Sequence, residues 1–416
     1  MNQHSHSLGQ AREPSIVWLG PIVDEATMIG YRAVSPAANR WQYGLLTALQ
    51  RIGASATTLG HVPEPLWPKG RPWIRGDSAR IAPGLKGRLV GYANLPLARQ
   101  RLLQAQYLRA FRYMCSCLGS PDAIVTYNAT PHNARVGLYA QEELGIPWVV
   151  VVADGPAVAS QLPAHEALVG RASGRVFLSW RNYTDYPSGP SLHLDGGIGQ
   201  VRFDPTRVAA GQPLGKSIVL YTGSIDHWAG VDLLVEAFLQ VPGRAVELWL
   251  CGKGTTVAVE RAVQSDSRIK VLGMVSEEQL ASVSQQATLF VNPRLSAVLG
   301  NRSNFPSKVL EYLSYGKPVI STWTEGLSPE YRDILTVPEE ETPDGLAQQI
   351  IDVLGWPENV RQRKAESILY FLTTRKLWSI QAERFRTWLV ALISAATPRT
   401  GAGEAYGVSA ESQAGA

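Results

Sequence analysis

The sequence has few of the residues that build disulfide frameworks and metal clusters. Its 416 residues include three cysteines, Cys115, Cys117 and Cys251, and no Cys-x-x-Cys pair. This pattern argues against a secreted disulfide scaffold and favours a reducing compartment. We therefore expect a cytoplasmic protein, with Cys115 and Cys117 as small buried residues.

Long hydrophobic runs are also missing. No stretch approaches the roughly 18 apolar residues that cross a bilayer. The first fourteen residues contain no apolar run. We expect no membrane-spanning helix and no signal peptide, so the protein should be soluble or peripheral to a membrane. No repeat of solenoid length is evident, which argues against a stacked-repeat fold.

The chain does contain enough apolar residues for two ordinary domains, since 45% of its 416 residues are hydrophobic. Strand-like and helix-like segments alternate in both halves, which is typical of parallel sheets covered by helices. The main strands are expected at residues 15–20, 55–59, 123–127, 147–152, 217–222, 246–251, 269–272, 288–292 and 318–322. First-half helices are expected at residues 39–51, 95–114 and 132–143.

The segments group into two domains. The expected divisions are a first α/β domain at 15–200, a linker at 201–216, a second α/β domain at 217–376, a helix at 377–396 that crosses back to the first domain, and disordered ends at 1–14 and 397–416. Residues 148–152 are all apolar, which predicts a central strand buried on both sides. Ser276 and Gln279 predict a capping box at a helix start.

The most informative segment is 304–320, which reads Asn-Phe-Pro-Ser-Lys-Val-Leu-Glu-Tyr-Leu-Ser-Tyr-Gly-Lys-Pro-Val-Ile between two predicted strands. Asn304 or Ser307 can cap the start of a helix here. Pro306 suits its first turn, Gly316 ends it, and Pro318 prevents its continuation. The segment therefore predicts a short helix.

A helical wheel gives this helix an apolar and a polar face. The apolar face holds Val309, Leu310 and Leu313, and the polar face holds Ser307, Lys308, Glu311 and Tyr315. A cation in the first turn opposes the helix dipole, so Lys308 suggests an anion such as a diphosphate at that end. One turn later, Glu311 could bind a ribose diol. A solvated face with a Lys308 to Glu311 ion pair is the alternative.

This segment resembles the signature of retaining GT-B glycosyltransferases of family 4, the glycosyl transferases of group 1, in the variant Phe-Pro-Ser-Lys-x-x-Glu-Tyr followed by Gly-Lys-Pro-Val. Similar matches occur at residues 221–224, 230–234, 250–254, 272–276 and 289–293, so the resemblance covers about half of the chain. It implies a GT-B fold, in which two Rossmann-like α/β domains turn their parallel sheets toward a central cleft. It also implies an enzyme that transfers a sugar from a nucleotide-diphosphate sugar to an acceptor hydroxyl with retention.

The resemblance implies a nucleotide-sugar site in the second domain. Glu311 would bind the ribose, the backbone around 273–275 would meet the base, and the loop after Gly223 would face the phosphates. The residues predicted for this site are Gly223, Ser224, His227, Gly252, Met274, Val275, Arg294, Ser303, Asn304, Ser307 and Glu311.

Two departures from the family pattern affect this site. Most relatives carry a second carboxylate eight positions before the one at Glu311, but Ser303 stands there. The usual contact with the donor sugar is therefore missing or replaced. Many relatives also carry an Arg and a Lys beside the phosphates, where this chain has Ser224 and Ala229.

Catalysis of this kind must neutralise charge that develops on the leaving phosphate. Lys308 and Arg302 are the first-ranked cations for that task. The chain has no Asp-x-Asp motif, and the resemblance implies that basic side chains and helix ends suffice, so we predict no cofactor and no essential metal. Asp154 stands where relatives often have a His-Asp pair after a buried strand. With Lys308 and Arg302, Asp154 forms the predicted catalytic set. The alternative is that its carboxylate only caps the turn before Pro156.

Three polar residues are predicted on the acceptor side of the first domain. Asn39 lies near the start of a predicted helix, and Asn128 and His132 follow the strand at 123–127. The carboxyl ends of strands are where open α/β sheets bind ligands. A capping or surface role is the alternative for His132. Residues 35–38 read Ser-Pro-Ala-Ala where relatives often have a Gly-Gly turn.

Positive charge is concentrated in one stretch of the first domain. Residues 69–112 hold ten Lys or Arg and one acid, Asp77, a local net charge of 10 − 1 = +9, whereas the whole chain carries +4. Together with an amphipathic helix at 95–114, this stretch suits an anionic membrane leaflet. Nucleic acid is not expected as a partner, because no recognition motif is present. An Arg-rich surface without a partner is the remaining alternative.

Three functions stay open at this point. The favoured one is a retaining glycosyltransferase that uses a nucleotide-sugar donor at the cytoplasmic face of a membrane, with a lipid-linked or polysaccharide acceptor; a soluble small-molecule acceptor is also open. The second is a nicotinamide-dependent enzyme, suggested by Gly252-Lys253-Gly254, although Val257 replaces the third Gly. The third is a nucleotide-sugar-binding pseudoenzyme, suggested by Ser303, Ser224 and Ala229.

Overall fold

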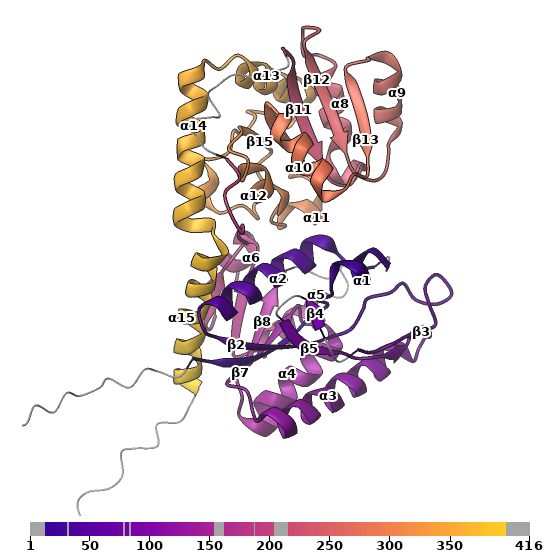
Figure 1. The fold of residues 1–416 in the computed structure, drawn as a ribbon, viewed down its shortest axis with the longest axis vertical. Coiled ribbons are helices and arrows are strands. Elements are labelled where there is room, and N and C mark those ends of the chain that lie inside the picture. Colours follow the sequence, from indigo (N-terminus) through magenta and orange to yellow (C-terminus); the bar gives the residue numbers. More distant parts are fainter. Residues whose placement is uncertain are drawn as a thin grey trace, which may run out of the picture.

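The computed structural model describes residues 13–30, 33–77, 80–82, 85–153, 162–186, 188–203 and 215–396. It contains two α/β domains, one above the other in Figure 1, and each is built on its own sheet. The expected two-domain α/β fold is confirmed. Asp154, residues 204–214 of the predicted linker, and the ends at 1–12 and 397–416 lie outside the described residues.

The first domain is built on an eight-stranded sheet in the order β10-β9-β8-β7-β1-β2-β5-β4. The strands are β1 (Ser15–Leu19), β2 (Ser55–Gly60), β4 (Arg80–Ala82), β5 (Leu85–Leu89), β7 (Ala123–Tyr127), β8 (Trp148–Val152), β9 (Gly174–Phe177) and β10 (Ser191–His193). All neighbours pair in parallel except β4 and β5. A separate antiparallel pair joins β3 (Trp73–Ile74) to β6 (Tyr92–Ala93). The first-half strands predicted above lie within one residue of those observed.

Helices cover both faces of this sheet. They are α1 (Glu25–Gly30), α2 (Pro36–Arg51), α3 (Arg99–Leu118), α4 (Pro131–Leu144), α5 (Leu162–Gly170) and α6 (Trp180–Thr184). The residues of β8 are buried, as their continuous apolar run predicts. Ser35 caps α2 by accepting a hydrogen bond from the backbone of Ala38 at 3.3 Å.

Helix α3 differs from its prediction in what covers its apolar face. Leu103, Tyr107 and Phe111, three of the residues expected to face lipid, are buried in the core of the first domain. This face is therefore not available to a membrane. The cysteines differ too, because Cys117 is exposed and Cys115 only partly buried at the end of this helix.

The second domain has a five-stranded parallel sheet in the order β13-β12-β11-β14-β15. The strands are β11 (Ser217–Thr222), β12 (Val246–Cys251), β13 (Ile269–Gly273), β14 (Leu289–Asn292) and β15 (Val319–Ser321). The helices between and after them are η2 (His227–Ala229), α8 (Val231–Phe238), α9 (Val257–Ser265), α10 (Glu277–Gln286), α11 (Leu299–Arg302), α12 (Lys308–Leu313), η3 (Pro329–Tyr331) and α13 (Pro343–Leu354). The capping box of Ser276 and Gln279 at the start of α10 is confirmed.

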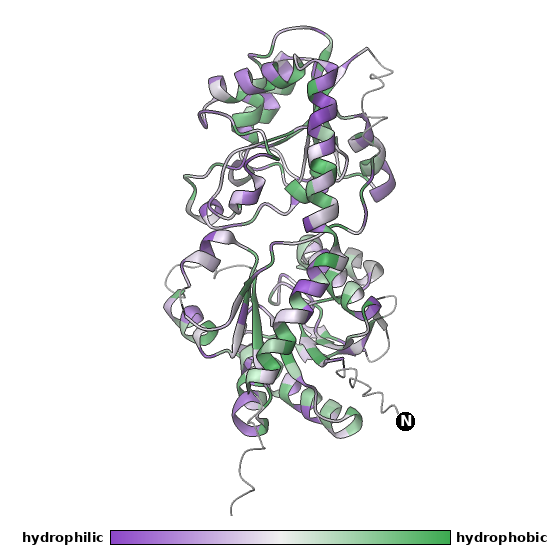
Figure 2. Cartoon of the chain, turned by 90° about the vertical axis from the view of Figure 1, so that its left-hand side faces the viewer, coloured by the Kyte–Doolittle hydropathy of each residue, from purple (hydrophilic) through white to green (hydrophobic). Residues whose placement is uncertain are grey.

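The chain then runs back along one side of the molecule (Figure 1). Helix α14 (Glu358–Phe371) contributes Ile368 and Phe371 to a core of the second domain, and the π-helix η4 (Leu372–Lys376) follows it. Helix α15 (Trp378–Ala396) contributes Phe385 and Leu389 to the core of the first domain. In Figure 2, the upper part of α14 is mostly hydrophilic and its lower end is more hydrophobic, and the buried residues Ala365, Ile368 and Phe371 lie in that second half. No helix in the described part of the chain is long and apolar enough to cross a membrane.

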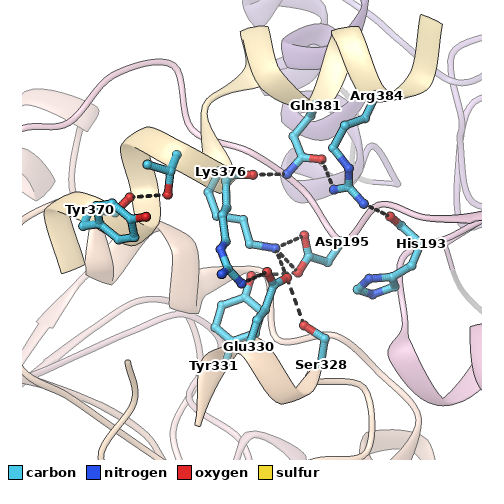
Figure 3. Close-up of polar contacts among 11 residues, drawn as sticks. His193, Asp195, Ser328, Glu330, Tyr331, Tyr370, Lys376, Gln381 and Arg384 are labelled. Carbon is cyan, nitrogen blue, oxygen red and sulfur yellow. Dashed lines mark hydrogen bonds and ion pairs between the residues drawn. The ribbon is translucent and has the colours of Figure 1, made fainter. Parts of the chain in front are cut away.

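A buried ion cluster joins the two domains where η4 meets the segment after β10 (Figure 3). Lys376 Nζ donates to both carboxylate oxygens of Asp195 at 2.8 and 2.7 Å and to Glu330 at 2.7 Å. Tyr331 donates to the same Asp195 carboxylate at 2.8 Å. Lys376 and Asp195 are each about 1% exposed. The lysine comes from the returning chain, Asp195 from the first domain, and Glu330 and Tyr331 from the second.

We expect Lys376→Met to destabilise the protein strongly, because it leaves the Asp195 carboxylate buried without its cation. Loss of one partner of a buried ion pair costs about 3 to 5 kcal/mol. Urea unfolding checks the loss, with Lys86→Met on the surface of β5 as the control. Asp195→Asn added to Lys376→Met should recover part of the loss. Equal midpoints for Lys376→Met and the control would contradict this role.

Candidate functional site

A cleft of about 1090 Å³ lies between the two domains. The first domain contributes the start of α2 and the segment around 195–200. The second contributes the loops after β11, β12 and β13 and the polar side of α12. The loops that follow parallel strands are the usual place for a ligand in α/β domains.

The cleft brings together most of the residues predicted for the second-domain site. Those that line it are Gly223, Ser224, Gly252, Met274, Val275, Arg294, Ser307, Lys308 and Glu311. They come from four separate loops and from α12 with its cap residue, and this convergence favours one shared ligand site.

Two glycines allow the loops after β11 and β12 to touch. Gly223 has φ +136° and Gly252 has φ +155°, a region that side chains rarely enter. A Cβ on Gly252 would lie 1.7 Å from the carbonyl oxygen of Gly223, so the two backbones leave no room for a side chain. A Cβ on Gly223 would lie 2.5 Å from Lys308 Nζ, so this lysine reaches directly over the loop.

Helix α12 is held in place by Tyr312. The Tyr312 hydroxyl donates to the carbonyl of Thr222 at 3.0 Å and accepts from the Thr222 amide at 2.8 Å. Val309, Leu310 and Leu313 are buried, as the helical wheel predicts. The expectation for Tyr315 is wrong, because its ring is buried and its hydroxyl accepts from Arg202 at 2.6 Å.

The start of α12 also differs from its prediction. Ser307 occupies the cap position but makes no capping hydrogen bond with its side chain. Both Ser307 and Lys308 face the cleft, so this corner is open toward the first domain rather than filled.

Lys308 is a desolvated cation beside the glycine loops. Its Nζ lies 3.1 Å from the Tyr221 hydroxyl and 4.3 Å from the centre of the Tyr221 ring. None of the described carboxylates lies within ion-pair distance of it, so the alternative pairing with Glu311 is not observed. Burial and the neighbouring Arg294 lower the pKa of Lys308 from 10.5 to about 7, against smaller opposing effects of Asp226 and Glu311. An added anion would stabilise its charged form.

Glu311 lies on the other side of the opening from a first-domain arginine. Arg40, in the first turns of α2, places Nη1 3.9 Å from Glu311 Oε2. Both side chains line the cleft. Glu311 is therefore accessible from the cleft and within reach of both domains.

Two predicted residues lie outside the cleft lining. Arg302 pairs with Glu325 at 2.9 Å, and Glu325 in turn pairs with Arg181 of the first domain at 2.6 Å. His227 is exposed and lies 3.0 Å from Asp232. The structure thus gives Arg302 a place in a contact between the domains.

Ser303 and Asn304 are also outside the lining. Ser303 ends α11, and the carbonyl of Asn304 accepts from the Thr324 hydroxyl at 3.3 Å.

The three acceptor-side predictions are held by local contacts in the first domain. The Asn39 side chain exchanges two hydrogen bonds of 2.9 Å with the backbone of Val23. Asn128 has φ +63° and accepts from the Ala153 amide at 2.8 Å. His132 is buried beside the ring of His61, and burial holds its pKa well below the usual value. None of the three lines the cleft.

Sequence reasoning missed several polar residues that line the cleft. They are Arg40, Asp195, Arg202, Asp226 and Lys253. Arg40 directly follows Asn39, so the sequence pointed to the correct helix start but to a residue that does not line the cleft. Asp226 stands inside the loop between Gly223 and Gly230, where an acid was not considered. No signal in the sequence connects Arg40 with the second domain.

The described residues contain no group of three His, Cys, Asp or Glu side chains that could hold a metal ion. The lining does contain cations that could contact a charged ligand, Arg40, Lys308 and Arg294 among them. The expectation that no metal is needed stays a prediction.

Comparisons with known proteins show what the second domain and the fold are similar to. Residues 216–355 match the family model of the glycosyl transferases of group 1. The fold is similar to that of sucrose-phosphate synthase from Thermosynechococcus elongatus, with a TM-score of 0.67, 18% identity, and coverage of 92% of this chain and 100% of that one. No curated protein matches the chain by sequence.

Two further solved structures have the same arrangement of domains. α,α-Trehalose 6-phosphate synthase from Burkholderia multivorans gives a TM-score of 0.65 at 15% identity, covering 95% of this chain and 100% of that one. HepE from Anabaena gives a TM-score of 0.61 at 14% identity, covering 91% of this chain and 100% of that one. The chain therefore has the GT-B fold. Residues 216–355 match the group 1 glycosyl transferase domain, and this match identifies the protein as a glycosyltransferase.

We expect Lys308→Met to leave the folded protein as stable as the natural one or more stable, because it removes a desolvated cation that lacks a carboxylate partner among the described residues. The folded pKa of about 7 lies below the ordinary 10.5, so the unfolded chain binds more protons between these values. The advantage of the variant should be largest below pH 7 and shrink as the pH rises toward 10.5. Thermal unfolding at several pH values measures it, and a lower melting temperature at pH 6 would indicate a structural lysine.

Proposed function

We propose that this glycosyltransferase transfers a sugar from a nucleoside diphosphate sugar to an acceptor hydroxyl, with retention at the anomeric carbon. The donor would occupy the second-domain side of the cleft, with its diphosphate between the Gly223 loop and Lys308 and its ribose at Glu311. HepE is described in complex with UDP and glucose, which supports a donor of this class.

The observation that carries the proposal is the position of Lys308. A desolvated cation without a carboxylate partner costs stability. Lys308 lies over the close contact between the backbones of Gly223 and Gly252. A diphosphate bound there would supply the missing negative charge. The Gly223 loop would allow the phosphates to approach the backbone closely.

In the proposed step the bond between the anomeric carbon and the diphosphate oxygen breaks. Negative charge develops on the leaving diphosphate, and the cations of the cleft stabilise it. The acceptor oxygen attacks from the same face, and its proton passes to the leaving phosphate. Ser303 replaces a carboxylate of the family pattern, so the contact with the donor sugar must come from another group. Asp154 stays a candidate for orienting the reactants.

The acceptor is proposed to be lipid-linked or part of a cell-surface polysaccharide, and the protein to act in the cytoplasm beside an anionic membrane. The positive charge of residues 69–112 supports this location. The apolar face of α3 does not contribute, because the core covers it. A soluble acceptor would make the membrane unnecessary for turnover.

The first test is the affinity for nucleoside diphosphates. A screen of UDP, GDP and ADP by thermal shift should find one that stabilises the protein. Glu311→Gln should then weaken its binding about tenfold or more, because each charged hydrogen bond contributes about 1.5 to 3 kcal/mol. Calorimetry compares this variant with Glu236→Gln on the exposed side of α8. Unchanged affinity in Glu311→Gln would refute the ribose assignment.

Arg40 offers charge compensation from the opposite domain. The loop of the second domain has no cation at Ser224 or Ala229 and instead carries Asp226, whose side chain accepts from the Ala229 amide at 2.8 Å. Arg40 reaches within 3.9 Å of Glu311 from across the opening. A diphosphate beside Glu311 would lie within range of this guanidinium, which can form paired hydrogen bonds to phosphate.

We expect Arg40→Gln to weaken binding of the nucleoside diphosphate about tenfold while leaving the weak binding of the corresponding nucleoside unchanged, because a charged hydrogen bond to phosphate contributes about 1.5 to 3 kcal/mol. Arg135→Gln on the exposed side of α4 is the control. Tighter binding of the diphosphate in Arg40→Gln would contradict this role. It would mean that Arg40 only competes with the ligand for Glu311.

A further inference from the structure

An exposed apolar tip protrudes from the first domain, and one buried side chain holds it together. Asn94 is fully buried. The side-chain amide of Asn94 donates to the backbone carbonyl of Pro65 at 2.7 Å and to that of Arg71 at 2.9 Å. The backbone carbonyl of Asn94 accepts a hydrogen bond from the backbone amide of Trp67 at 3.2 Å. The loop at 65–72 is thereby fixed to the segment that leads into α3.

The tip presents large apolar side chains to solvent. Leu97 is 98% exposed and has φ +64°, and Trp73 is 68% exposed. Leu66, Trp67 and Leu95 are also exposed hydrophobic residues of these two segments. The exposed cations Lys69, Arg71 and Arg75 alternate with them along the chain. Tryptophan mixed with Lys and Arg is typical of surfaces that sit at the lipid headgroups.

A groove of about 700 Å³ lies next to this tip and outside the interdomain cleft. Arg88 of β5 and Gln106, Arg109 and Tyr113 of α3 form its walls. Gly76 and Gly91 also line the groove, and their backbones pack closely, since a Cβ on Gly76 would lie 2.6 Å from the backbone nitrogen of Gly91. The lining thus combines two guanidinium groups with two residues that have no side chain.

The groove and the tip are continuous along α3. Leu102, Gln106, Arg109 and Tyr113 are spaced four, three and four residues apart, so they form one stripe of the helix. Leu102 and Tyr113 are exposed. On the strand side, Gly76 follows Trp73 by three residues.

The arginines of the groove are available for a ligand. Neither Arg88 nor Arg109 forms an ion pair with any carboxylate in the part of the chain that the structure describes. The guanidinium of Arg88 lies 5.5 Å from the centre of the Tyr113 ring, a cation–π contact that limits its movement. Asp77 is the one acid in the lining. Its backbone is paired to Leu89 at 2.9 and 2.6 Å.

We propose that the first domain docks on an anionic bilayer through this tip, and that the groove between Arg88 and Arg109 receives a lipid phosphate. Trp73 and Leu97 enter the headgroup layer, and the neighbouring cations meet its negative charge. Two arginines suit a phosphate because a planar guanidinium can donate two parallel hydrogen bonds to its oxygens. The inference rests on the proposed membrane-linked function and names the surface that it uses.

The test is co-sedimentation of the full chain with vesicles of phosphatidylcholine alone and of phosphatidylcholine mixed with phosphatidylglycerol. We expect binding to the anionic vesicles only. Arg88→Gln with Arg109→Gln should lower the partition constant about 30-fold, which corresponds to about 1 kcal/mol for each cation near the surface. Trp73→Ser with Leu97→Ser should lower it by a similar factor.

The matched control is Arg135→Gln with Arg363→Gln, which removes the same charge from exposed positions of α4 and α14. A loss equal to that of the groove variant would overturn the proposal, as would undiminished binding of the Trp73 and Leu97 variant or no binding to either vesicle. Because the groove is proposed to hold a phosphate group, inorganic phosphate should release the protein from the vesicles better than chloride does at equal ionic strength. Equal release by the two anions would overturn the phosphate contact in the groove. Binding of a nucleoside diphosphate without vesicles should be unchanged in all these variants, so failure of the docking proposal is separable from failure of the proposed function.

Discussion

The arrangement of the molecule depends on the burial of one cation, Lys376. Its ammonium group is buried and forms ion pairs with both Asp195 and Glu330, and a buried charge without such partners is costly. These groups belong to the returning chain, the first domain and the second domain, so satisfying the charge fixes where the three meet. Tyr331 adds a hydrogen bond to Asp195 from the second domain. Since Asp195 also lines the cleft, the same cluster sets one wall of the site.

The site is organised around a second desolvated cation, Lys308, whose surroundings differ from those of Lys376. Lys308 has no carboxylate partner among the described residues, and burial keeps its pKa near 7. A fold that keeps such a group gives up stability locally, which is common where charge must be available to a ligand. Arg40 lies across the opening, so positive charge comes from both domains. A donor between them would therefore be held by the complete cleft rather than by the second domain alone.

The sequence was sufficient for the second-domain sheet, for four strands of the first-domain sheet and for α12, because strand periodicity, glycines and a proline-flanked helix are local signals. It missed β4, β5, β9 and β10 of the first-domain sheet. It also located the Gly223 loop and Lys308 through a family pattern. It could not identify Arg40, whose contact with Glu311 joins segments far apart in the chain. The amphipathic pattern of α3 was real, but a pattern does not say what covers the apolar face, and here the core does. Asn39 and His132 were predicted as acceptor-side residues because their side chains are polar. In the structure, Asn39 is hydrogen-bonded to the backbone of Val23, and His132 packs against the ring of His61.

The most direct test of the central claim is a crystal structure of the protein with the nucleoside diphosphate that stabilises it best. The account predicts that the phosphates lie between the Gly223 loop and Lys308, that the ribose hydroxyls contact Glu311, and that Arg40 moves from Glu311 toward the phosphates. A nucleotide bound outside the cleft, or one whose phosphates point away from Lys308, would contradict it.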